Sequence, residues 1–426
     1  MFRDRQAQGD KMSENIQQEL PSFYERPNVE SEILPIAQGI KIGIERVTNK
    51  ALGLGGAYGA WGENFNNQAL PEFVGTRLGA ELPESDVMNL SELGFQHRHH
   101  VPDLSAADHL ELELEVGARL IRAAAQANGW ELGDVDGLLV GMSAPVSEDY
   151  VAQIARRAGM REDALKVSVH KACDGSMGAL NLAINPDLAV PGQMNVAEEL
   201  AGKKVLVGGI EGLSRFTSHA RDKNALQLFG NGMGLFGVVP GENMKLLAGR
   251  SHENYDQEGL LQVRMYYPHS KEMAPGKSLL EVSQAGSSHI RVAGMMHEPQ
   301  DGLPIVMAGL MGMVKLFVRS GVEVVTDVHL QYQALMEKLG QSGREINVAI
   351  AHHANYKINL LKAKQLLKEG VQIPMPWLLH DFGNVSAASC AIAFLRQLQE
   401  INPGDHVLFD GFGAGTYYDV MAVSMG

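Results

Sequence analysis

Three polar residues, each next to small or apolar neighbours, are the strongest candidates for chemistry in this chain. Cys173 follows a predicted strand at 166–169 and precedes a segment rich in glycine and alanine, where a helix is expected to begin. Orphan backbone N–H groups and the helix dipole favour a thiolate at such a position. A lone cysteine is also commonly a buried core thiol, so position alone leaves both interpretations open. Cys390 lies well inside a second small-residue segment, and we expect it to belong to the core.

The other two candidates, His352 and Asn384, lie in the second half of the chain. The segment 352–355 reads His-His-Ala-Asn and follows the apolar run 348–351. Ligands bind at the carboxyl ends of strands in α/β sheets, so this segment is a candidate binding site. Asn384 precedes the second small-residue segment, although asparagine at a helix start is also a common cap. The glycines of the run 411–415 would let backbone N–H groups approach an oxyanion, or simply serve a tight turn.

The elements that must position these residues occur twice in the same order. Residues 106–128 predict an amphipathic helix that Ser105 caps and Gly129 closes, and residues 137–141 predict a buried strand after it. A helical pattern and an apolar run recur in the second half, at 329–339 and 348–351. Each small-residue helix is then followed by a strand, at 204–209 and 406–411. The repeat predicts an α/β protein built by internal duplication, with helices beginning at Cys173 and Asn384 in equivalent, central places.

The domain boundaries follow from the same pattern. Residues 1–38 are polar and charged without sustained periodicity, and we interpret them as an extension that is disordered or lies along the surface. Residues 39–245 form the half that carries the cysteine. Residues 246–426 form the half that carries the histidine and the asparagine.

Composition narrows the possible functions. The 426 residues are 45% hydrophobic and carry a formal net charge of −14, which argues against nucleic acid or an anionic membrane as partner. No apolar run reaches the roughly 18 residues that span a membrane. Two cysteines and no secretory signal predict a reducing, cytoplasmic location. No histidine, cysteine and carboxylate pattern has metal-ligand spacing, so we expect no metal.

Four segments, in this order and spacing, resemble β-ketoacyl-acyl-carrier-protein synthase III, a branch of the thiolase superfamily. They are Ala172-Cys173, His352-His-Ala-Asn355, Gly383-Asn384-Val-Ser-Ala-Ala-Ser389 and Gly411-Phe-Gly-Ala-Gly415. The resemblance extends from about residue 40 to the end of the chain. It implies the thiolase fold, with duplicated α/β halves in a five-layer αβαβα arrangement. It also implies a homodimer that pairs through the central sheets.

The same resemblance implies a reaction. Cys173 would accept an acyl group from a thioester, and His352 and Asn384 would hydrogen-bond the enolate formed when a malonyl-type thioester loses CO2. The backbone N–H groups of Cys173 and Gly415 would form the oxyanion hole. This reaction is a decarboxylative Claisen condensation, typical of fatty acid or polyketide biosynthesis. Acyl-coenzyme A or an acyl carrier protein would be the substrate, and no further cofactor is implied.

Further positions are implied to bind substrate or carrier. They are Arg98, His353, Asn355 and Lys357, of which the lysine matches a basic position that such enzymes present to acidic carrier proteins. The chain also departs from the family. His353 stands where glutamine is usual and Gln96 where arginine is common. Upstream of the turn at 93–95, no tryptophan stands at the place where the adenine of coenzyme A often stacks. An insertion at about 186–199 follows the cysteine helix, and these departures together indicate a specialised substrate.

Several alternatives remain. The cysteine could transfer an acyl group to an oxygen, nitrogen or sulfur acceptor without decarboxylation. It could catalyse a condensation like that of hydroxymethylglutaryl-coenzyme A synthase, which needs a glutamate near the cysteine; we expect Glu211 to be structural instead. The chain could be a catalytically silent partner subunit, or, much less favoured, a papain-like protease. For the cluster His97-Arg-His-His100, a solvated polar turn is favoured over a metal site.

Overall fold

Two stacked sheets with helices between and outside them make up the computed structural model. It describes residues 21–36, 39–143, 147, 149–188, 194–220, 222–253, 281–284, 289–293, 314–413 and 417–426. Gly415, the second residue of the predicted oxyanion hole, lies outside these ranges, as does most of the proposed extension.

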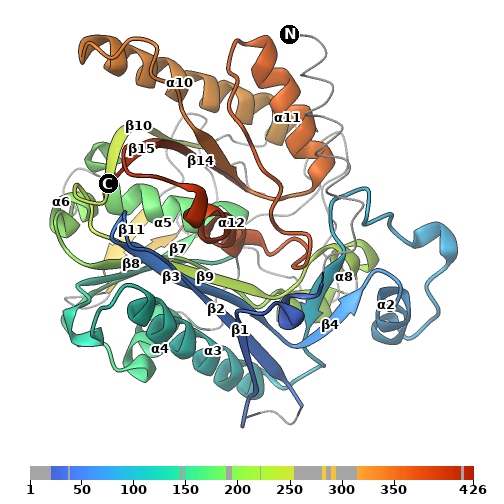
Figure 1. The fold of residues 1–426 in the computed structure, drawn as a ribbon. Coiled ribbons are helices and arrows are strands. Elements are labelled where there is room, and N and C mark those ends of the chain that lie inside the picture. Colours follow the sequence, from blue (N-terminus) through green and yellow to red (C-terminus); the bar gives the residue numbers. More distant parts are fainter. Residues whose placement is uncertain are drawn as a thin grey trace.

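The larger sheet has nine strands and belongs mainly to the first half of the chain (Figure 1). Its order is β1 (Val29–Ile33), β2 (Lys41–Asn49), β3 (Leu54–Trp61), β9 (Gly232–Val238), β8 (Val205–Glu211), β6 (Gly137–Gly141), β7 (Leu165–His170), β12 (His289–Ala293) and β11 (Glu281–Gln284). Strands β8, β6, β7 and β12 run parallel to one another. Every residue of β3, β6, β7, β8 and β9 is buried, because helices cover both faces of the sheet.

The smaller sheet has four strands and comes from the second half. Its order is β10 (Met244–Glu253), β15 (Tyr417–Met425), β14 (His406–Gly413) and β13 (Val348–Ala351). β13 and β14 are parallel, and the other two pairs are antiparallel. A separate ribbon pairs β4 (Glu63–Asn66) with β5 (His97–His100).

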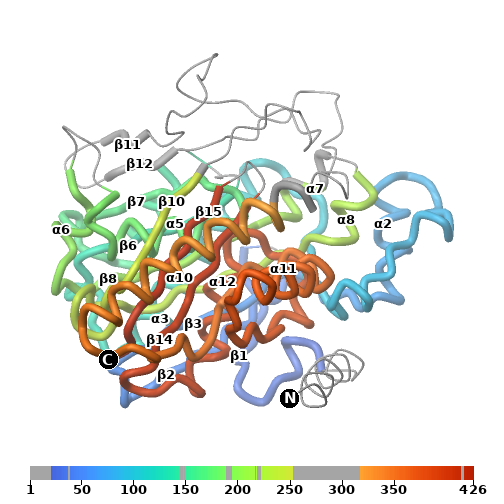
Figure 2. The backbone as a smooth tube through the Cα atoms, turned by 90° about the horizontal axis from the view of Figure 1, so that it is seen from above, coloured from blue at the N-terminus to red at the C-terminus, as the bar shows by residue number. Residues whose placement is uncertain are grey.

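The helices complete three layers (Figures 1 and 2). α3 (Ala106–Ala127) and α4 (Tyr150–Ala158) cover the outer face of the large sheet. α5 (Gly175–Ile184) and α12 (Ser389–Gln397) lie between the sheets, and α10 (Gly321–Lys338) and α11 (Tyr356–Lys368) cover the small sheet. The predicted five-layer αβαβα fold is therefore confirmed. The shorter helices are α2 (Leu70–Leu78), α6 (Val196–Leu200), α7 (Leu213–Ala220) and α8 (Lys223–Leu228).

Short helical turns link these elements. The 3₁₀ turns are η1 (Phe23–Glu25), η2 (Glu84–Asp86), η3 (Leu132–Asp134), η4 (Ala172–Asp174), η5 (Pro186–Leu188), η7 (Ser386–Ala388) and η8 (Leu398–Glu400), and η6 (Val314–Ser320) is a π-helical turn. In the expected insertion after α5, η5 and α6 are the described elements. None of the helices in the described ranges is long and apolar enough to cross a membrane.

The central helices owe their place to small side chains. All ten residues of α5 are buried, and glycine or alanine at 175, 178 and 179 lets neighbouring backbones approach on every side. α12 is buried from Ser389 through Leu395. The expectation that both small-residue helices are central is confirmed. Cys390 is fully buried within α12, and burial raises the pKa of its thiol, as fits the expected core role.

The duplication is visible in the order of elements, but its register differs from our expectation. α3–β6–η4–α5–β8–β9 is repeated by α10–β13–η7–α12–β14–β15. Ala172 and Ser386 open the two equivalent turns with φ of 48° and 44°, a conformation that residues other than glycine rarely adopt. The counterpart of Cys173 is therefore Ala387, not Asn384, which lies two residues before Ser386. The helices begin at 175 and 389, after the 3₁₀ turns, rather than at 173 and 384.

The predicted boundary at residue 38 is wrong for the residues that the structure describes. β1 pairs with β2 at the edge of the large sheet, and Phe23 is fully buried against Tyr58 and Phe382. The stretch is polar on average, but Phe23 and Leu34 are buried in the core and Tyr24 packs against His99. Residues 22–34 are therefore part of the fold rather than a separate extension.

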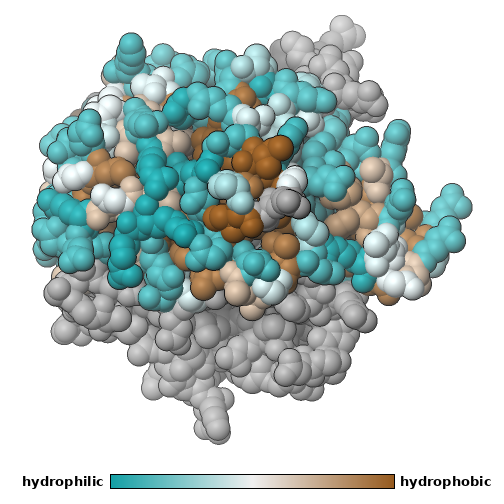
Figure 3. All heavy atoms as spheres, turned by 90° about the horizontal axis from the view of Figure 1, so that it is seen from below, coloured by the Kyte–Doolittle hydropathy of each residue, from teal (hydrophilic) through white to brown (hydrophobic). Residues whose placement is uncertain are grey.

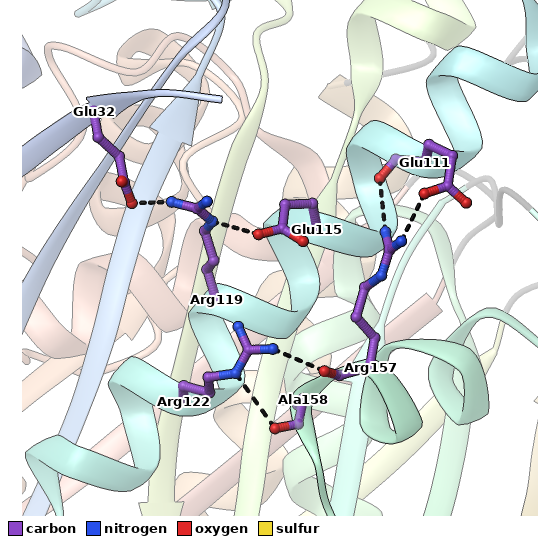
Figure 4. A network of polar contacts seen from close by, with 7 residues as sticks. All are labelled: Glu32, Glu111, Glu115, Arg119, Arg122, Arg157 and Ala158. Atoms are coloured by element: carbon purple, nitrogen blue, oxygen red, sulfur yellow. Dashed lines mark hydrogen bonds and ion pairs between the residues drawn. The ribbon is translucent and has the colours of Figure 1, made fainter. Parts of the chain in front are cut away.

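Ion pairs join β1 to α3, and α3 to α4 (Figure 4). Arg119 of α3 bonds to Glu115 one turn earlier, at 2.7 Å, and forms an ion pair with Glu32 of β1. Arg157 of α4 bonds to Glu111 at 2.6 Å. Hydrophilic side chains dominate the surface seen from this side, with smaller hydrophobic areas between them (Figure 3). This polar outer layer is as expected for helices whose other face covers a sheet.

Candidate active site

Cys173 occupies a turn between a buried strand and a buried helix. β7 ends at His170, Ala172 adopts its positive φ, and α5 begins two residues after the cysteine. Cys173 and Ala172 are only partly buried, whereas Lys171 and Asp174 on either side of them are buried. A Cβ added to Gly413 would lie 3.0 Å from the backbone nitrogen of Cys173. Glycine at the end of β14 therefore lets this strand end directly beside that N–H group.

Ser386 joins the second half of the chain to the cysteine, and sequence reasoning missed it. Its hydroxyl donates to the Cys173 sulfur at 3.2 Å. Its backbone N–H donates to the side-chain oxygen of Asn384 at 2.9 Å. The sequence signal was the internal repeat, which places the positive-φ turn of each half at the same point between the sheets.

Asn384 is 4% exposed, and the structure fixes its side chain. One amide hydrogen reaches the carbonyl of Ala354 at 3.2 Å, while the side-chain oxygen accepts from Ser386. The backbone is held by bonds to Leu228 and Gly230. Because a primary amide carries two hydrogens, the second is left to donate to a bound group.

His352 is a buried neutral imidazole at the end of β13. Its backbone carbonyl accepts from Asn359 at 2.9 Å, and its ring meets Phe412 edge-on at 5.1 Å. Burial lowers its pKa to about 3, with smaller contributions from His353 and Lys362. Nδ1 has no partner among the described residues. The neutral ring can therefore still form a hydrogen bond through Nδ1.

His353, by contrast, uses both ring nitrogens within the protein. Nδ1 bonds to the carbonyl of Ala351 at 2.8 Å, and Nε2 accepts from the backbone N–H of Leu378 at 2.9 Å. Burial lowers its pKa to about 3, so it is neutral and has one tautomer. The ring packs on Trp377 with centroids 4.5 Å apart. These contacts orient His353 toward the 377–378 segment.

Trp377 packs on the turn at 93–95, which lacks the expected tryptophan on its upstream side. Its indole N–H donates to the carbonyl of Gly94 at 2.8 Å, and its ring lies 5.3 Å from that of Phe95. Gly94 has φ of 86°, and an added Cβ would clash with the indole at 2.6 Å. A residue from far downstream therefore occupies this face of the turn.

Asn355 and Lys357 lie at the start of α11. Asn355 caps the helix by accepting from the backbone N–H of Ile358 at 3.0 Å. Lys357 is exposed and forms an ion pair with Glu92, which is exposed as well. The lysine is thus on the surface beside the 93–95 turn.

Arg98 is fully buried under Gly383, next to the loop that carries Asn384. Nη2 donates to the side chain of Asn67 at 2.5 Å, while Nε and Nη1 have no partner among the described residues. Burial lowers the pKa of Arg98 to about 9, so the guanidinium is still charged at neutral pH. A Cβ on Gly383 would lie 3.0 Å from that of Arg98.

The cluster at 97–100 is a buried strand, which corrects the expectation of a solvated turn. His99 packs edge-on against Tyr24 at 4.7 Å, and His100 stacks on Phe73 at 4.6 Å. Burial lowers the pKa of His99 to about 3 and that of His100 well below its usual value. No group of three or more potential ligand residues in the described ranges is arranged to hold a metal ion.

Charged groups directly beneath the cysteine neutralise one another. Lys171 pairs with Asp419 at 2.5 Å, and Asn181 donates to the same carboxylate at 2.7 Å. Burial and the neighbouring Asp419 raise the pKa of Asp174 well above its usual value. The positive charge of Lys171 is therefore balanced by Asp419, although the lysine lies only two residues before Cys173.

Comparison with known proteins gives one consistent resemblance. Residues 336–425 match the family model for the C-terminal part of 3-oxoacyl-[acyl-carrier-protein] synthase III. The beta-ketoacyl-[acyl-carrier-protein] synthase III of Bacillus pumilus is 26% identical over 370 residues, which cover 84% of this chain and 96% of the relative. A synthase III from Halalkalibacterium halodurans is 25% identical over 353 residues, or 81% and 91% of the two chains.

Solved structures agree with this result. The synthase III of Pseudomonas aeruginosa has a TM-score of 0.58 at 19% identity, covering 89% of this chain and 98% of that one. Tetrahydroxynaphthalene synthase of Streptomyces coelicolor, a type III polyketide synthase, has a TM-score of 0.57 at 13% identity, covering 90% and 98%. The fold, the matched family model and the curated relatives together make the chain a thiolase-fold protein that is similar to β-ketoacyl-[acyl-carrier-protein] synthase III.

Proposed function

We propose that the protein joins an acyl thioester to a malonyl-type thioester by decarboxylative Claisen condensation, through an acyl-Cys173 intermediate. The observation that carries the proposal is the convergence of two turns from the two halves. Ser386, two residues after Asn384, touches the Cys173 sulfur. His352, at the end of the neighbouring β13, packs against Phe412, and β14 ends beside Cys173 one residue later.

In the first step the Cys173 thiolate attacks the acyl carbonyl carbon, and the thiolate of the donor leaves. The turn before α5 is proposed to favour the thiolate, because the start of a helix carries a partial positive charge. The backbone N–H of Cys173 is proposed to donate to the tetrahedral oxyanion. Gly415 is proposed as the second donor, since β14 ends two residues earlier, at Gly413, beside that N–H.

In the second step the extender thioester loses CO2, and its enolate attacks the acyl carbon. His352 and Asn384 are proposed to donate to the enolate oxygen. A neutral imidazole suits this role because it can donate a hydrogen bond without carrying a positive charge in the buried site. Each well-placed donor contributes about 3 to 4 kcal/mol to such a transition state.

The substrates follow from the named relatives. We propose coenzyme A or an acyl carrier protein as the carrier of both thioesters, no further cofactor, and a cytoplasmic role in fatty acid or polyketide synthesis. Exposed Lys357 is the proposed contact for an acidic carrier. Asn355 supports it by capping the same helix, whereas His353 is assigned to orienting Trp377. Arg98, charged and incompletely paired under Gly383, is proposed to act on a polar group of the substrate.

A homodimer is proposed with one restriction. In the described residues β12 occupies the edge of β7, the strand that leads to Cys173. A partner chain that extended the large sheet on this side would therefore pair with β11 rather than with β7. Equilibrium sedimentation tests the dimer itself, and a monomer at micromolar concentration would contradict it.

The reaction is tested by incubating the protein with an acyl-coenzyme A panel and malonyl thioesters carrying a labelled carboxyl group. We expect labelled CO2 and a β-ketoacyl product in equal amounts. Asn384→Ala, which leaves Cys173 in place, is expected to form the acyl-enzyme but release little CO2. An acyl-enzyme that transfers its acyl group to an oxygen, nitrogen or sulfur acceptor without CO2 would replace the proposal with simple acyl transfer.

A further inference from the structure

Glu211 is a buried carboxylic acid that the reaction above does not use. It is the last residue of β8 and is 2% exposed. Burial raises its pKa to about 8, even though hydrogen bonds from Ser143 oppose the shift. Sequence reasoning assigned it a structural role. Its neighbours in the folded chain indicate a different one.

A continuous chain of hydrogen-bonding groups connects Glu211 to the catalytic sulfur. The backbone N–H and the hydroxyl of Ser143, just after β6, both bond to the Glu211 carboxyl. The two hydroxyls of Ser143 and Ser386 lie 2.5 Å apart. The hydroxyl of Ser386 then lies 3.2 Å from the sulfur of Cys173. Each hydroxyl has one hydrogen and can accept from one side while donating to the other.

We propose that Glu211, Ser143 and Ser386 form a proton relay that takes the thiol proton of Cys173 and later returns it. The proposal deepens the function above, since it rests on Cys173 as the acyl-accepting nucleophile. In this relay Glu211 holds the proton, and it does not itself contact the reacting atoms. The relay spans both halves of the chain, because Ser386 belongs to the second half and the other members to the first.

The proton movements balance over one turnover. The thiol proton passes to Ser386, the Ser386 proton to Ser143, and the Ser143 proton to the Glu211 carboxylate. The thiolate then forms a bond to the acyl carbon, and the donor thiolate leaves and takes a proton from solvent. When the enolate attacks the acyl carbon, the Cys173 sulfur leaves with the electron pair. The proton on Glu211 returns through the same hydroxyls and restores the thiol.

The surroundings of Glu211 suit a group that exchanges a proton with a thiol. Glu113 of α3, Tyr150 of α4 and Arg215 of α7 are the charged or titratable groups that act on it. Arg215 forms an ion pair with Glu113 at 3.0 Å, and its charge lowers the pKa of Glu211 while that of Glu113 raises it. Transfer costs least when donor and acceptor have similar pKa values, and the value of Glu211 is close to that of a cysteine thiol.

The test measures alkylation of Cys173 by iodoacetamide between pH 6 and 10, with the labelled peptide identified by mass spectrometry. Two coupled groups lose their protons in two macroscopic steps, so the wild-type rate should rise over two ionisations. Glu211→Gln should leave a single ionisation. Ser386→Ala, which removes the hydroxyl that donates to the sulfur, should slow alkylation at pH 7 by about tenfold.

Ser143→Ala is the variant that decides the outcome if Glu211→Gln does not fold. It removes one partly buried hydroxyl and keeps the backbone bond to Glu211. We expect the two ionisations in the pH profile to lie closer together than in the wild type. We also expect alkylation at pH 7 to be slower. Glu211→Asp, which keeps a carboxyl group, should restore part of the two-step profile. The matched control is Ser176→Ala, because Ser176 is buried in α5 close to Cys173 and its hydroxyl has no partner in the described residues.

Coincident profiles for the wild type, Glu211→Gln and Ser143→Ala would overturn the relay. This outcome differs from failure of the proposed function, because alkylation needs no acyl substrate. A wild type that shows the two-step profile but never forms an acyl-enzyme would keep the relay and reject the condensation. If the acyl-enzyme of Glu211→Gln forms and condenses normally, with an unchanged pH profile, the condensation is kept and the relay is rejected.

Discussion

The two turns that meet between the sheets have the same backbone and different side chains. Ala172 and Ser386 both adopt a positive φ, and each is followed by a 3₁₀ turn and a buried small-residue helix. In the first turn the next residue is Cys173, partly exposed. In the second it is Ala387, fully buried, while Ser386 turns its hydroxyl toward the sulfur.

The difference shows that the two halves of a duplicated fold can take different roles in one site. The strained turn costs each half about 1 to 2 kcal/mol, and the surrounding layers must hold it. The first half uses the position to present a nucleophile. The second half uses it to present supporting polar groups, Ser386 and, two residues earlier, Asn384. Positive φ at a functional turn is thus retained in both halves, although only one carries the thiol.

The largest expected effect separates the two cysteines. Cys173→Ala removes the proposed nucleophile and should lower turnover by at least about a thousandfold. Cys390→Ala removes a buried sulfur from the equivalent helix, and it should cost about 1 kcal/mol of stability with turnover within about threefold of wild type. Product formation and thermal melting measure the two effects. Similar losses of activity in both variants would contradict the assignment.

Two adjacent histidines give the next contrast. His352→Ala removes a proposed enolate donor, so condensation should slow by about a hundredfold or more, while the acyl-enzyme still forms. His353→Gln can keep one donor and one acceptor for Ala351 and Leu378, so condensation should stay within about tenfold. Rapid-quench kinetics separates acylation from condensation. A loss in His353→Gln as large as that in His352→Ala would remove the distinction between them.

Arg396 and Lys357 contrast a buried and an exposed ion pair. Arg396 bonds to both oxygens of Asp381 at 2.6 and 2.8 Å and is nearly buried. Arg396→Ala leaves that carboxylate unpaired and should cost about 3 to 5 kcal/mol. Lys357→Ala breaks the surface pair with Glu92 and should cost less than about 1 kcal/mol. Urea denaturation measures both, and equal costs would contradict the burial shown by the structure.

Acid sensitivity should be shared by both halves. His99, His352 and His353 have folded-state pKa values of about 3, below the usual 6.5 of the unfolded chain. Between these values the unfolded state binds more protons, so stability is present above pH 6.5 and is lost as pH falls toward 3. At pH 5 each contributes a loss of about 2 kcal/mol. Urea midpoints at pH 7 and 5 test the slope, which should be smaller in His353→Gln; identical midpoints in the wild type would contradict it.

Local signals in the sequence predicted much of the fold. Ser105 caps α3 at Ala106 as expected, by accepting from Asp108, and the strands at 137–141 and 348–351 have the expected bounds. These elements depend on capping, glycine termination and apolar runs, which neighbouring residues determine. The central position of α5 and α12 followed from their small side chains. The repeat established the two halves.

Contacts between distant parts of the chain could not be read in this way. Ser386 lies more than two hundred residues from both Cys173 and Ser143, and nothing in the local pattern of either serine indicates the contact. Trp377 reaches the Gly94 turn from the second half for the same reason. The register of the repeat was misjudged because Gly383 and Asn384 resemble a helix start. The positive φ of Ser386 shows that the turn begins later.

The central claim is that Cys173, and no other group, carries the acyl chain. The direct measurement is the mass of the intact protein after incubation with a panel of acyl thioesters, followed by peptide mapping of any adduct. We predict one acyl group per chain, located on Cys173, absent in Cys173→Ala and removed when a malonyl thioester is added. No adduct from any thioester, or an adduct on another residue that persists in Cys173→Ala, would contradict the account.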